Sequence, residues 1–188
     1  MSYDLIFLLE EPSIENVLEQ LLPQIIPPEI RYICISHQGK QDLTKSIPVK
    51  IRAFQSNPTT KFVIVHDQDS HDCKQLKAEL LEICQNAGKS DILIRIICHE
   101  LESWFLGDLT AVEKAYQLKP QSLSKKQNQN KFRNPDQLNS AKQELQKLVN
   151  EYYAGTHSKK IAPHLSLTEN TSHSFHIFLD GVKNLIIK

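Results

Sequence analysis

Residues 61–70 read KFVIVHDQDS, an apolar and β-branched run that ends in two aspartates, Asp67 and Asp69. A continuous run of this kind is typical of a strand that is buried on both faces, as in a parallel sheet. Similar runs occur at residues 4–10, 31–36 and 91–100. Carboxylates at the end of a buried strand are unfavourable unless a cation or hydrogen-bond donors compensate them. The stretch therefore predicts a central strand with a polar site at its end.

Helical patterns lie between these runs. Ser13 can cap a helix that begins SIENVLEQLL, and Pro23 is expected to end it. Residues 41–54 give a weaker pattern because Pro48 interrupts it, whereas CKQLKAELLEICQNAG gives a strong helix with a stop at Gly88. Strands and helices that alternate in this way predict an α/β fold, a small parallel sheet of about four strands flanked by helices.

The second half of the chain reads as helical. Helices are predicted at residues 103–118, 136–153 and 172–187, with an exposed polar loop at 119–136. We therefore expect an α/β core at residues 1–108 and a C-terminal helical extension at 109–188, packed on the core as one compact unit.

The charge balance limits the partners that the chain can attract. Lys plus Arg and Asp plus Glu both number 22, so no global basic field indicates a nucleic-acid partner. A local basic group does lie in the predicted loop, made of Lys125, Lys126, Lys131 and Arg133. It can be a solvated loop or a set of phosphate contacts, and the sequence leaves both open.

The cysteines and the N-terminus indicate the compartment. The four cysteines form no C-x-x-C pair, and three of them lie within apolar runs, which favours free thiols in a reducing environment. The N-terminal sequence has no cationic leader, and no apolar run approaches the roughly 20 residues of a membrane span. We expect a soluble protein of the cytoplasm.

Acidic residues follow three of the four predicted strands. Because parallel strands end at the same edge of a sheet, these carboxylates are expected to meet there and to repel one another. They are Glu10 and Glu11 after the first strand, Asp67 and Asp69 after the third, and Glu100 and Glu102 after the fourth.

Hard cations resolve such repulsion, since Mg²⁺ and Mn²⁺ prefer oxygen ligands. In an extended chain, Asp67 and Asp69 would project to the same side, with Cα atoms about 6 to 7 Å apart. This spacing suits one ion or a pair of ions, and such sites support phosphoryl transfer or phosphodiester hydrolysis. The nearby His66, His71 and His99 raise zinc or a general base as alternatives, but no His-x-x-x-His or Cys/His spacing supports a closed zinc site.

Several short motifs carry a family resemblance. They are LLEEPSIENVL, HQGKQDL, VHDQDSHDC and HELESWFLGD after the four strands, followed by KFRNPDQL, SKKIAP and NTSHSFHIF. In this order and spacing the chain resembles bacterial proteins of domain-of-unknown-function family 4276, a Toprim-related group, over nearly its whole length.

The resemblance implies specific roles for the acids. Toprim folds hold divalent metal with a Glu after the first strand and an Asp-x-Asp after the third, which places these roles on Glu10, Asp67 and Asp69. Glu102 is a further acid of the family type, Glu100 is a further ligand candidate, and Glu11 stands where the family turn usually has Gly. The resemblance also implies an ATPase partner of the SMC or AAA type and a role in anti-phage defence.

Three functions are compatible with these observations. The first is a metal-dependent nuclease that uses Mg²⁺ or Mn²⁺. The second is a catalytically silent adaptor or sensor that docks an ATPase. The third is a phosphatase of the haloacid-dehalogenase type, with Asp67 as nucleophile and Asp69 as acid, although its motif would follow two β-α units instead of opening the fold.

Overall fold

The computed structural model describes residues 3–54 and 57–187. Within these ranges, four parallel strands form one sheet in the order β2-β1-β3-β4. The strands are β1 (Leu5–Leu9), β2 (Tyr32–Ser36), β3 (Lys61–Asp67) and β4 (Ile92–Ile97). Each lies within a run predicted from the sequence, so the predicted fold class is confirmed.

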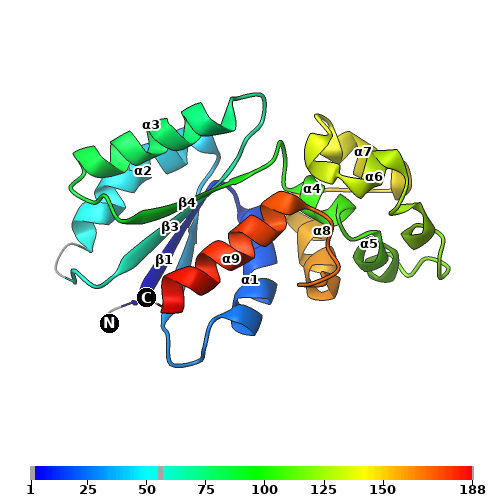
Figure 1. Cartoon of the computed structure of the whole chain (residues 1–188), viewed down its shortest axis with the longest axis horizontal. Coiled ribbons are helices and arrows are strands. Elements are labelled where there is room, and N and C mark those ends of the chain that lie inside the picture. Colours follow the sequence, from blue (N-terminus) through cyan, green and yellow to red (C-terminus); the bar gives the residue numbers. More distant parts are fainter. Residues whose placement is uncertain (1–2, 55–56, 188) are drawn as a thin grey trace.

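Helices cover both faces of the sheet (Figure 1). They are α1 (Pro12–Ile25), α2 (Lys40–Ala53), α3 (Cys73–Asn86) and α9 (His173–Ile187). Alternate residues of β3 point to opposite faces: Val63 and Val65 belong to the hydrophobic cluster that includes α1 and α9, whereas Phe62 and Ile64 pack with α2 and α3. The strands are therefore buried on both sides, as their continuous apolar sequences predict.

Two prolines that were expected to break helices do not. Helix α1 continues through Pro23 to Ile25, and α2 continues through Pro48 to Ala53. Each proline removes a backbone donor, at a cost of about 3 kcal/mol in a helix interior. In α2, the completely or almost completely buried Leu43, Ile47 and Ile51 form one apolar stripe, and its burial against the sheet is of sufficient size to offset that cost.

The region between β4 and α9 consists of shorter helices than predicted. These are α4 (Glu102–Leu106), α5 (Leu109–Ala115), α6 (Asn130–Arg133), α7 (Ala141–Leu148) and α8 (Ala154–Ile161), with 3₁₀ turns at Ser124–Lys126, Pro135–Gln137 and Ala162–His164. The predicted helix at 103–118 is split at Gly107, because Asp108 accepts a hydrogen bond from the Ala111 N–H and starts a new helix.

The predicted loop at 119–136 is also more ordered than expected. It contains one of the 3₁₀ turns and α6, and it buries Leu123 and Phe132. The predicted helix at 136–153 shrinks to α7, whereas the one at 172–187 contains all of α9 and begins one residue before it.

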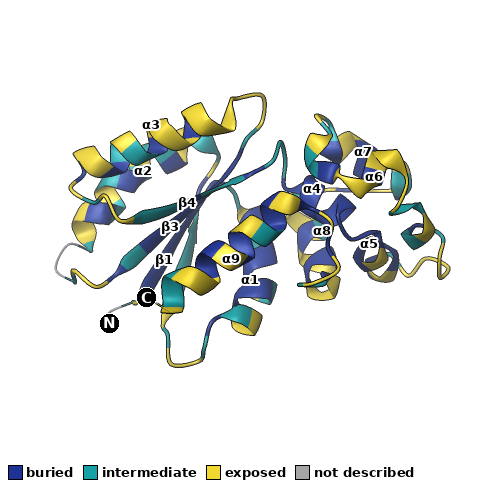
Figure 2. Ribbon diagram, in the orientation of Figure 1, coloured by how far each residue is buried: buried dark blue, intermediate teal, exposed yellow. Residues whose placement is uncertain are grey.

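One hydrophobic cluster joins the sheet to the region beyond it (Figure 2). It runs from Phe7 and Val65 of the sheet to Trp104 of α4 and Phe175 and Phe178 of α9. Trp104 packs against both phenylalanines, with ring centroids 5.2 and 5.3 Å away.

A domain division after residue 108 stays a prediction. In the described ranges, none of the helices is long and apolar enough to span a membrane.

Candidate metal centre at the strand ends

The strand order places a crevice between β1 and β3. The chain moves from β1 to one neighbour, β2, and then returns to the other side of β1 to form β3. In open α/β sheets, ligands bind beyond the carboxyl ends of the strands at such a reversal point. Glu10 follows β1 directly, and Asp67 is the last residue of β3. The two acids therefore flank the crevice that this topology creates.

Asp67 is one of three buried acids of the group, at 9% exposure. Its Oδ2 accepts one long hydrogen bond, 3.4 Å from the Leu101 N–H, and its Oδ1 is buried without a partner among the described residues. Burial raises the pKa of Asp67 well above its usual value, and the charges of neighbouring acids raise it further. These neighbours are Glu10, Glu11, Glu102 and Asp69. The carboxylate therefore lacks compensation.

Glu10 is held against the end of β3. Its Oε2 accepts a hydrogen bond from the Asp67 N–H at 2.8 Å and lies 2.8 Å from His66 Nδ1. The same His66 nitrogen is 2.5 Å from the Asp67 carbonyl oxygen. Within the described part of the chain, His66 Nε2 is buried without a partner. His66 is therefore a buried neighbour of Glu10.

Asp69 lies outside the strand, in a turn. The prediction assumed an extended chain, but Asp69 has a φ of 51°, in the left-handed region. His99, after β4, has a φ of 56°, and its carbonyl accepts a hydrogen bond from the Asp69 N–H at 2.8 Å. Strained residues of this kind persist where surrounding structure holds them, often at functional sites. Burial and the Glu10 and Glu100 charges raise the pKa of Asp69, and His66 and His71 partly oppose this.

Glu102 and Glu100 differ in their partners. Glu102 is buried, and burial raises its pKa; its own backbone N–H and the Tyr152 hydroxyl partly oppose the shift. That hydroxyl is buried and makes no hydrogen bond of normal geometry to any described residue. Glu100 Oε2 instead accepts a hydrogen bond from the Lys142 N–H at 2.9 Å, in the first turn of α7. Glu100 therefore caps a helix at the rim of the site.

Glu11 is the sixth acid of the predicted group. It is half-buried at the N-terminus of α1, where Ser13 Oγ donates a hydrogen bond to its carboxylate. The structure thus brings all six predicted acids to one edge of the sheet, and Glu10 and Asp69 both act on Asp67 electrostatically.

An open pocket of about 460 Å³ lies beside these acids. It is lined by Gln68, Asp69, Ser70, His71, His99, Glu100 and Asn139. The carboxylates surround this edge without converging: over the described residues, no three His, Cys, Asp or Glu side chains are arranged to hold a metal ion. The unpartnered Asp67 Oδ1 and the neighbouring carboxylates nevertheless fit a hard divalent cation.

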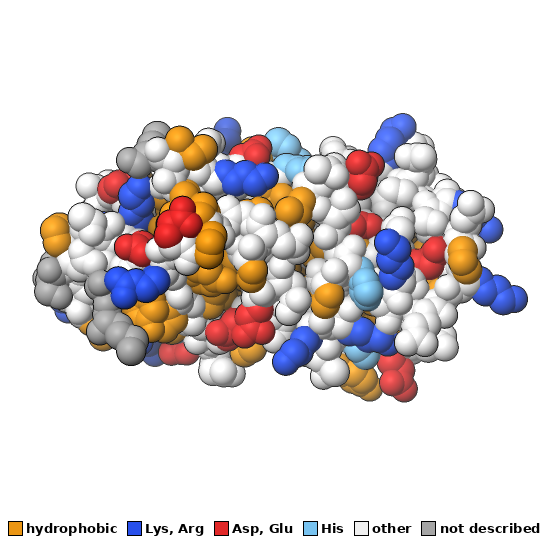
Figure 3. Space-filling model, turned by 90° about the horizontal axis from the view of Figure 1, so that it is seen from below, with side chains coloured by type: hydrophobic (Ala, Val, Ile, Leu, Met, Phe, Trp, Pro, Cys, Tyr) orange, Lys and Arg blue, Asp and Glu red, His pale blue; other side chains and the backbone are white. Residues whose placement is uncertain are grey.

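The predicted basic group lies in the region beyond the sheet. Lys125 and Arg133 are exposed and Lys126 is half-buried, whereas Lys131 pairs with Glu144 of α7, which also binds Lys147 at 2.8 Å. On the face shown in Figure 3, Lys and Arg side chains are scattered among acids and do not form a continuous track.

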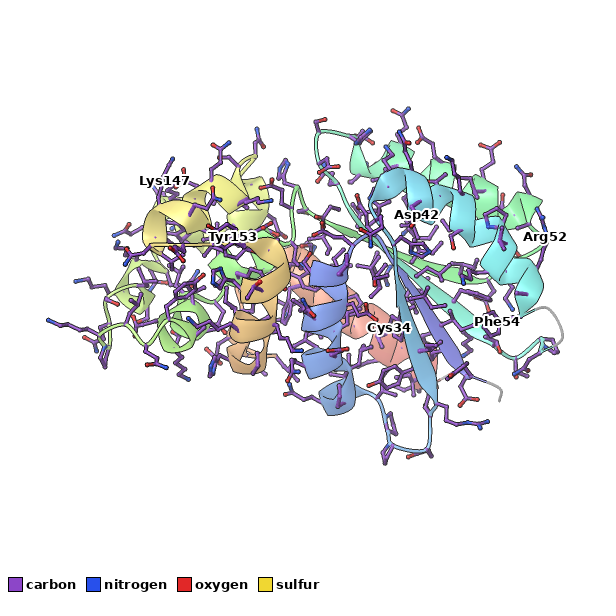
Figure 4. The ribbon with its side chains drawn as sticks, turned by 180° about the vertical axis from the view of Figure 1, so that it is seen from behind. Cys34, Asp42, Arg52, Phe54, Lys147 and Tyr153 are labelled. Carbon is purple, nitrogen blue, oxygen red and sulfur yellow. The ribbon has the colours of Figure 1, made fainter. Side chains whose placement is uncertain are left out.

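One polar residue near the pocket was missed by the sequence reasoning. Lys40, the first residue of α2, has its Nζ 2.9 Å from His71 Nε2 on the pocket wall. Figure 4 labels Asp42 in the same first turn of α2, near the strand ends. The motif HQGKQDL was the available signal, because it follows the second strand as the acids follow the others.

The family model described as Domain of unknown function (DUF4276) matches residues 9–183. The chain belongs to this family. The match includes every predicted acid and the motifs of the C-terminal half. No curated protein matches the chain.

Two solved structures resemble this DUF4276 chain in fold. The C-terminal region of the Burkholderia pseudomallei OLD protein is 14% identical, with a TM-score of 0.57, over 99% of this chain and 100% of that one. The C-terminal region of the Xanthomonas campestris pv. campestris OLD protein is 14% identical, with a TM-score of 0.53, over 98% and 96% of the two chains. At this identity the likeness shows the fold alone.

The late motifs of the DUF4276 chain have a structural role. In KFRNPDQL, Asp136 accepts hydrogen bonds from the Ser174 N–H and the Ser172 hydroxyl, both at 2.6 Å. The Ser174 hydroxyl accepts a bond from Trp104 Nε1 at 3.0 Å. Asn170 donates to the Trp104 carbonyl at 2.8 Å, and a Cβ at Gly107 would overlap its side chain. This network joins α4 to the start of α9.

Proposed function

We propose that this protein is a divalent-metal-dependent nuclease with a Toprim-like site. The observation that carries the proposal is Asp67, a buried carboxylate with an unpartnered oxygen, at the strand reversal point and among four further acids that raise its pKa. A carboxylate in this setting is compensated when a cation binds. Phosphodiester hydrolysis is the chemistry that a carboxylate-bound Mg²⁺ or Mn²⁺ commonly supports.

Glu10, Asp67 and Asp69 would hold the metal, with Glu102 and Glu11 as the adjacent oxygen donors. Glu100 is a less suitable ligand because it caps α7. When bound, the metal would neutralise charge on the phosphate and lower the pKa of a bound water. For its Oε2 to bind the metal, Glu10 would have to turn from His66 and the Asp67 N–H, since both now contact that oxygen.

The decisive experiment compares metal binding and cleavage in matched variants. Calorimetry with Mg²⁺ and Mn²⁺ is run on the wild type and on the Asp67→Asn, Asp69→Asn variant, with a parallel cleavage assay on plasmid DNA and RNA. We expect the double variant to lose both. The control, Glu82→Gln with Asp180→Asn, removes the same charge from exposed positions and should keep both. Unchanged metal binding in the Asp67/Asp69 variant would overturn the proposal.

We propose that those cations of the basic group that form no ion pair with any described residue add phosphate contacts. Lys125, Lys126 and Arg133 are available, whereas Lys131 is engaged with Glu144. Replacing the three by Ala should weaken binding to all nucleic-acid sequences alike and lower the salt dependence of binding. An unchanged salt dependence would show that this region is simply solvated.

A catalytically silent adaptor is the second candidate. It is favoured by the failure of the described acids to converge on a metal-ligand geometry. An adaptor would co-purify with its ATPase and leave nucleic acid uncleaved, in the presence or absence of that partner. The phosphatase alternative predicts an acid-labile phosphoryl group on Asp67, and none of the structural observations favours it.

We further propose that the protein acts with an ATPase of the SMC or AAA type in anti-phage defence. The support is the family resemblance together with the similar structures, which are C-terminal regions of OLD proteins. This chain matches those C-terminal regions over almost their full length. Co-expression with a neighbouring ATPase, followed by phage plaque counts, tests this. Protection should be lost in the Asp67→Asn variant.

A further inference from the structure

The acidic edge of the sheet poses a problem for any nucleic-acid substrate. Six carboxylates lie around this crevice or its rim, and neighbouring acids raise the pKa of both Asp67 and Asp69. A phosphodiester strand is itself negatively charged, and bound metal neutralises only the acids that it contacts. A strand that lies over the pocket therefore needs cationic contacts beside the acids.

Lys40 is placed to make such a contact. Gly39 precedes it with a φ of 96°, which glycine adopts readily, and the Gly39 N–H donates to the Glu10 carbonyl at 2.9 Å. This bond ties the start of α2 to the residue that follows β1. The half-buried Lys40 side chain then extends to His71, so that Nζ and His71 Nε2 are 2.9 Å apart.

Lys40 contacts a histidine and not one of the nearby acids. In the described part of the chain, Lys40 forms no ion pair with a carboxylate, although Asp69 and Glu100 line the same pocket as His71. An ammonium group has three donors, and the imidazole accepts one of them. The positive charge and the remaining donors are therefore available to a ligand. His71 is in turn fixed by the Gln68 side chain, which donates to its carbonyl at 2.8 Å.

We propose that Lys40 is a substrate-binding residue that contacts a backbone phosphate of the nucleic acid as it enters the acidic crevice, and that His71 positions it. This inference rests on the proposed nuclease function and deepens it by naming the first protein contact of the strand. Lysine binds phosphate as a point charge, so the contact is independent of base sequence.

The test measures by fluorescence anisotropy how tightly the full chain binds a fluorescein-labelled single-stranded oligonucleotide. The buffer contains Ca²⁺, and a gel checks that the strand stays intact. We expect Lys40→Met to weaken binding about tenfold and to lower the slope of log K against log salt by about 0.7, the value for one phosphate contact. Lys40→Arg should restore most of the affinity. Lys45→Met, on an exposed position of α2, is the matched control and should match the wild type.

A double-variant cycle tests the role of His71. His71→Ala should weaken binding by a smaller factor than Lys40→Met, and combining the two should add little, because both act through one contact. Independent, additive losses would overturn the positioning role.

The two proposals fail in different ways. If Lys40→Met binds the oligonucleotide as tightly as Lys45→Met, or if the wild type does not bind it, the Lys40 proposal is overturned. If the wild type binds no Mg²⁺ or Mn²⁺, the nuclease proposal fails whatever the Lys40 variants show.

Discussion

The protein buries carboxylates in two regions that differ in the hydrogen-bond donors they supply. Beyond the sheet, Glu113 is buried but accepts hydrogen bonds from the N–H groups of Gln121, Leu123 and Ser124, at 2.9, 2.8 and 3.1 Å. At the strand ends, Asp67 accepts one bond of 3.4 Å, and its other oxygen finds no partner among the described residues. The two carboxylates are thus buried to a similar extent, but the hydrogen-bonding capacity of Glu113 is satisfied and that of Asp67 is not.

The pKa directions express this difference. Burial alone would raise the pKa of Glu113, but the backbone hydrogen bonds outweigh it and hold the pKa below its usual value. Burial and neighbouring acids both raise the pKa of Asp67. Buried charge by itself is thus no sign of a site; buried charge without donors is.

Removing a carboxylate that accepts several hydrogen bonds should destabilise the protein most. Asp136→Ala leaves the Ser174 N–H and the Ser172 hydroxyl without their 2.6 Å partner, and uncaps α9. We expect the free energy of unfolding to fall by about 3 kcal/mol, measured by urea denaturation. Asp180→Ala, an exposed position on α9, serves as control. A loss as small as the control's would show that the network contributes little.

A bound cation should stabilise the fold by compensating the Asp67 carboxylate. Mn²⁺ at about 100 times its dissociation constant should add about 2.7 kcal/mol to the free energy of unfolding. The Asp67→Asn, Asp69→Asn variant should show no such gain. Thermal unfolding with and without Mn²⁺ measures this, and an equal gain in the double variant would place the metal elsewhere.

These two regions also differ in how far the sequence could predict them. The strands, their order along the chain and the meeting of the acids follow from continuous apolar runs and from the geometry of parallel sheets. The roles of individual acids did not follow. Glu100 was a candidate ligand because it follows β4, but its partner is the Lys142 N–H, 42 residues away in the chain.

The region beyond the sheet was harder to predict for the same reason. Helical periodicity predicted long helices in this region. Its shorter helices are instead held by contacts between residues far apart in the sequence, such as the Ser166 N–H, which donates to Asp108 at 2.8 Å. Local patterns do not record such distant partners. The same limitation hid Lys40, whose partner His71 is 31 residues away.

A smaller effect tests whether Asp67 is unsatisfied without metal. Because its folded pKa is raised above the unfolded value, ionised Asp67 destabilises the fold, increasingly as pH rises from the unfolded pKa toward the folded one. Asp67→Asn should therefore raise the free energy of unfolding in EDTA by about 1 to 2 kcal/mol at neutral pH. The gain should shrink toward pH 4. A loss of stability at neutral pH would mean that the charge is compensated.

Glu113 should show a pH dependence of stability opposite in sign to that of Asp67, and smaller in size. The folded pKa of Glu113 is lowered, so ionised Glu113 contributes stability above the unfolded pKa of about 4.3 and loses it as pH falls through the folded pKa. Glu113→Gln keeps the shape and removes the charge, and should lower the free energy of unfolding at pH 7 by about 1 kcal/mol. Urea denaturation from pH 7 to pH 3 should show both variants converging with the wild type in acid. At neutral pH the two should differ in sign, with Glu113→Gln less stable and Asp67→Asn more stable than the wild type. If both variants moved in the same direction at neutral pH, hydrogen-bond donors would not be what distinguishes the two regions, and the case for a cation at Asp67 would lose its basis.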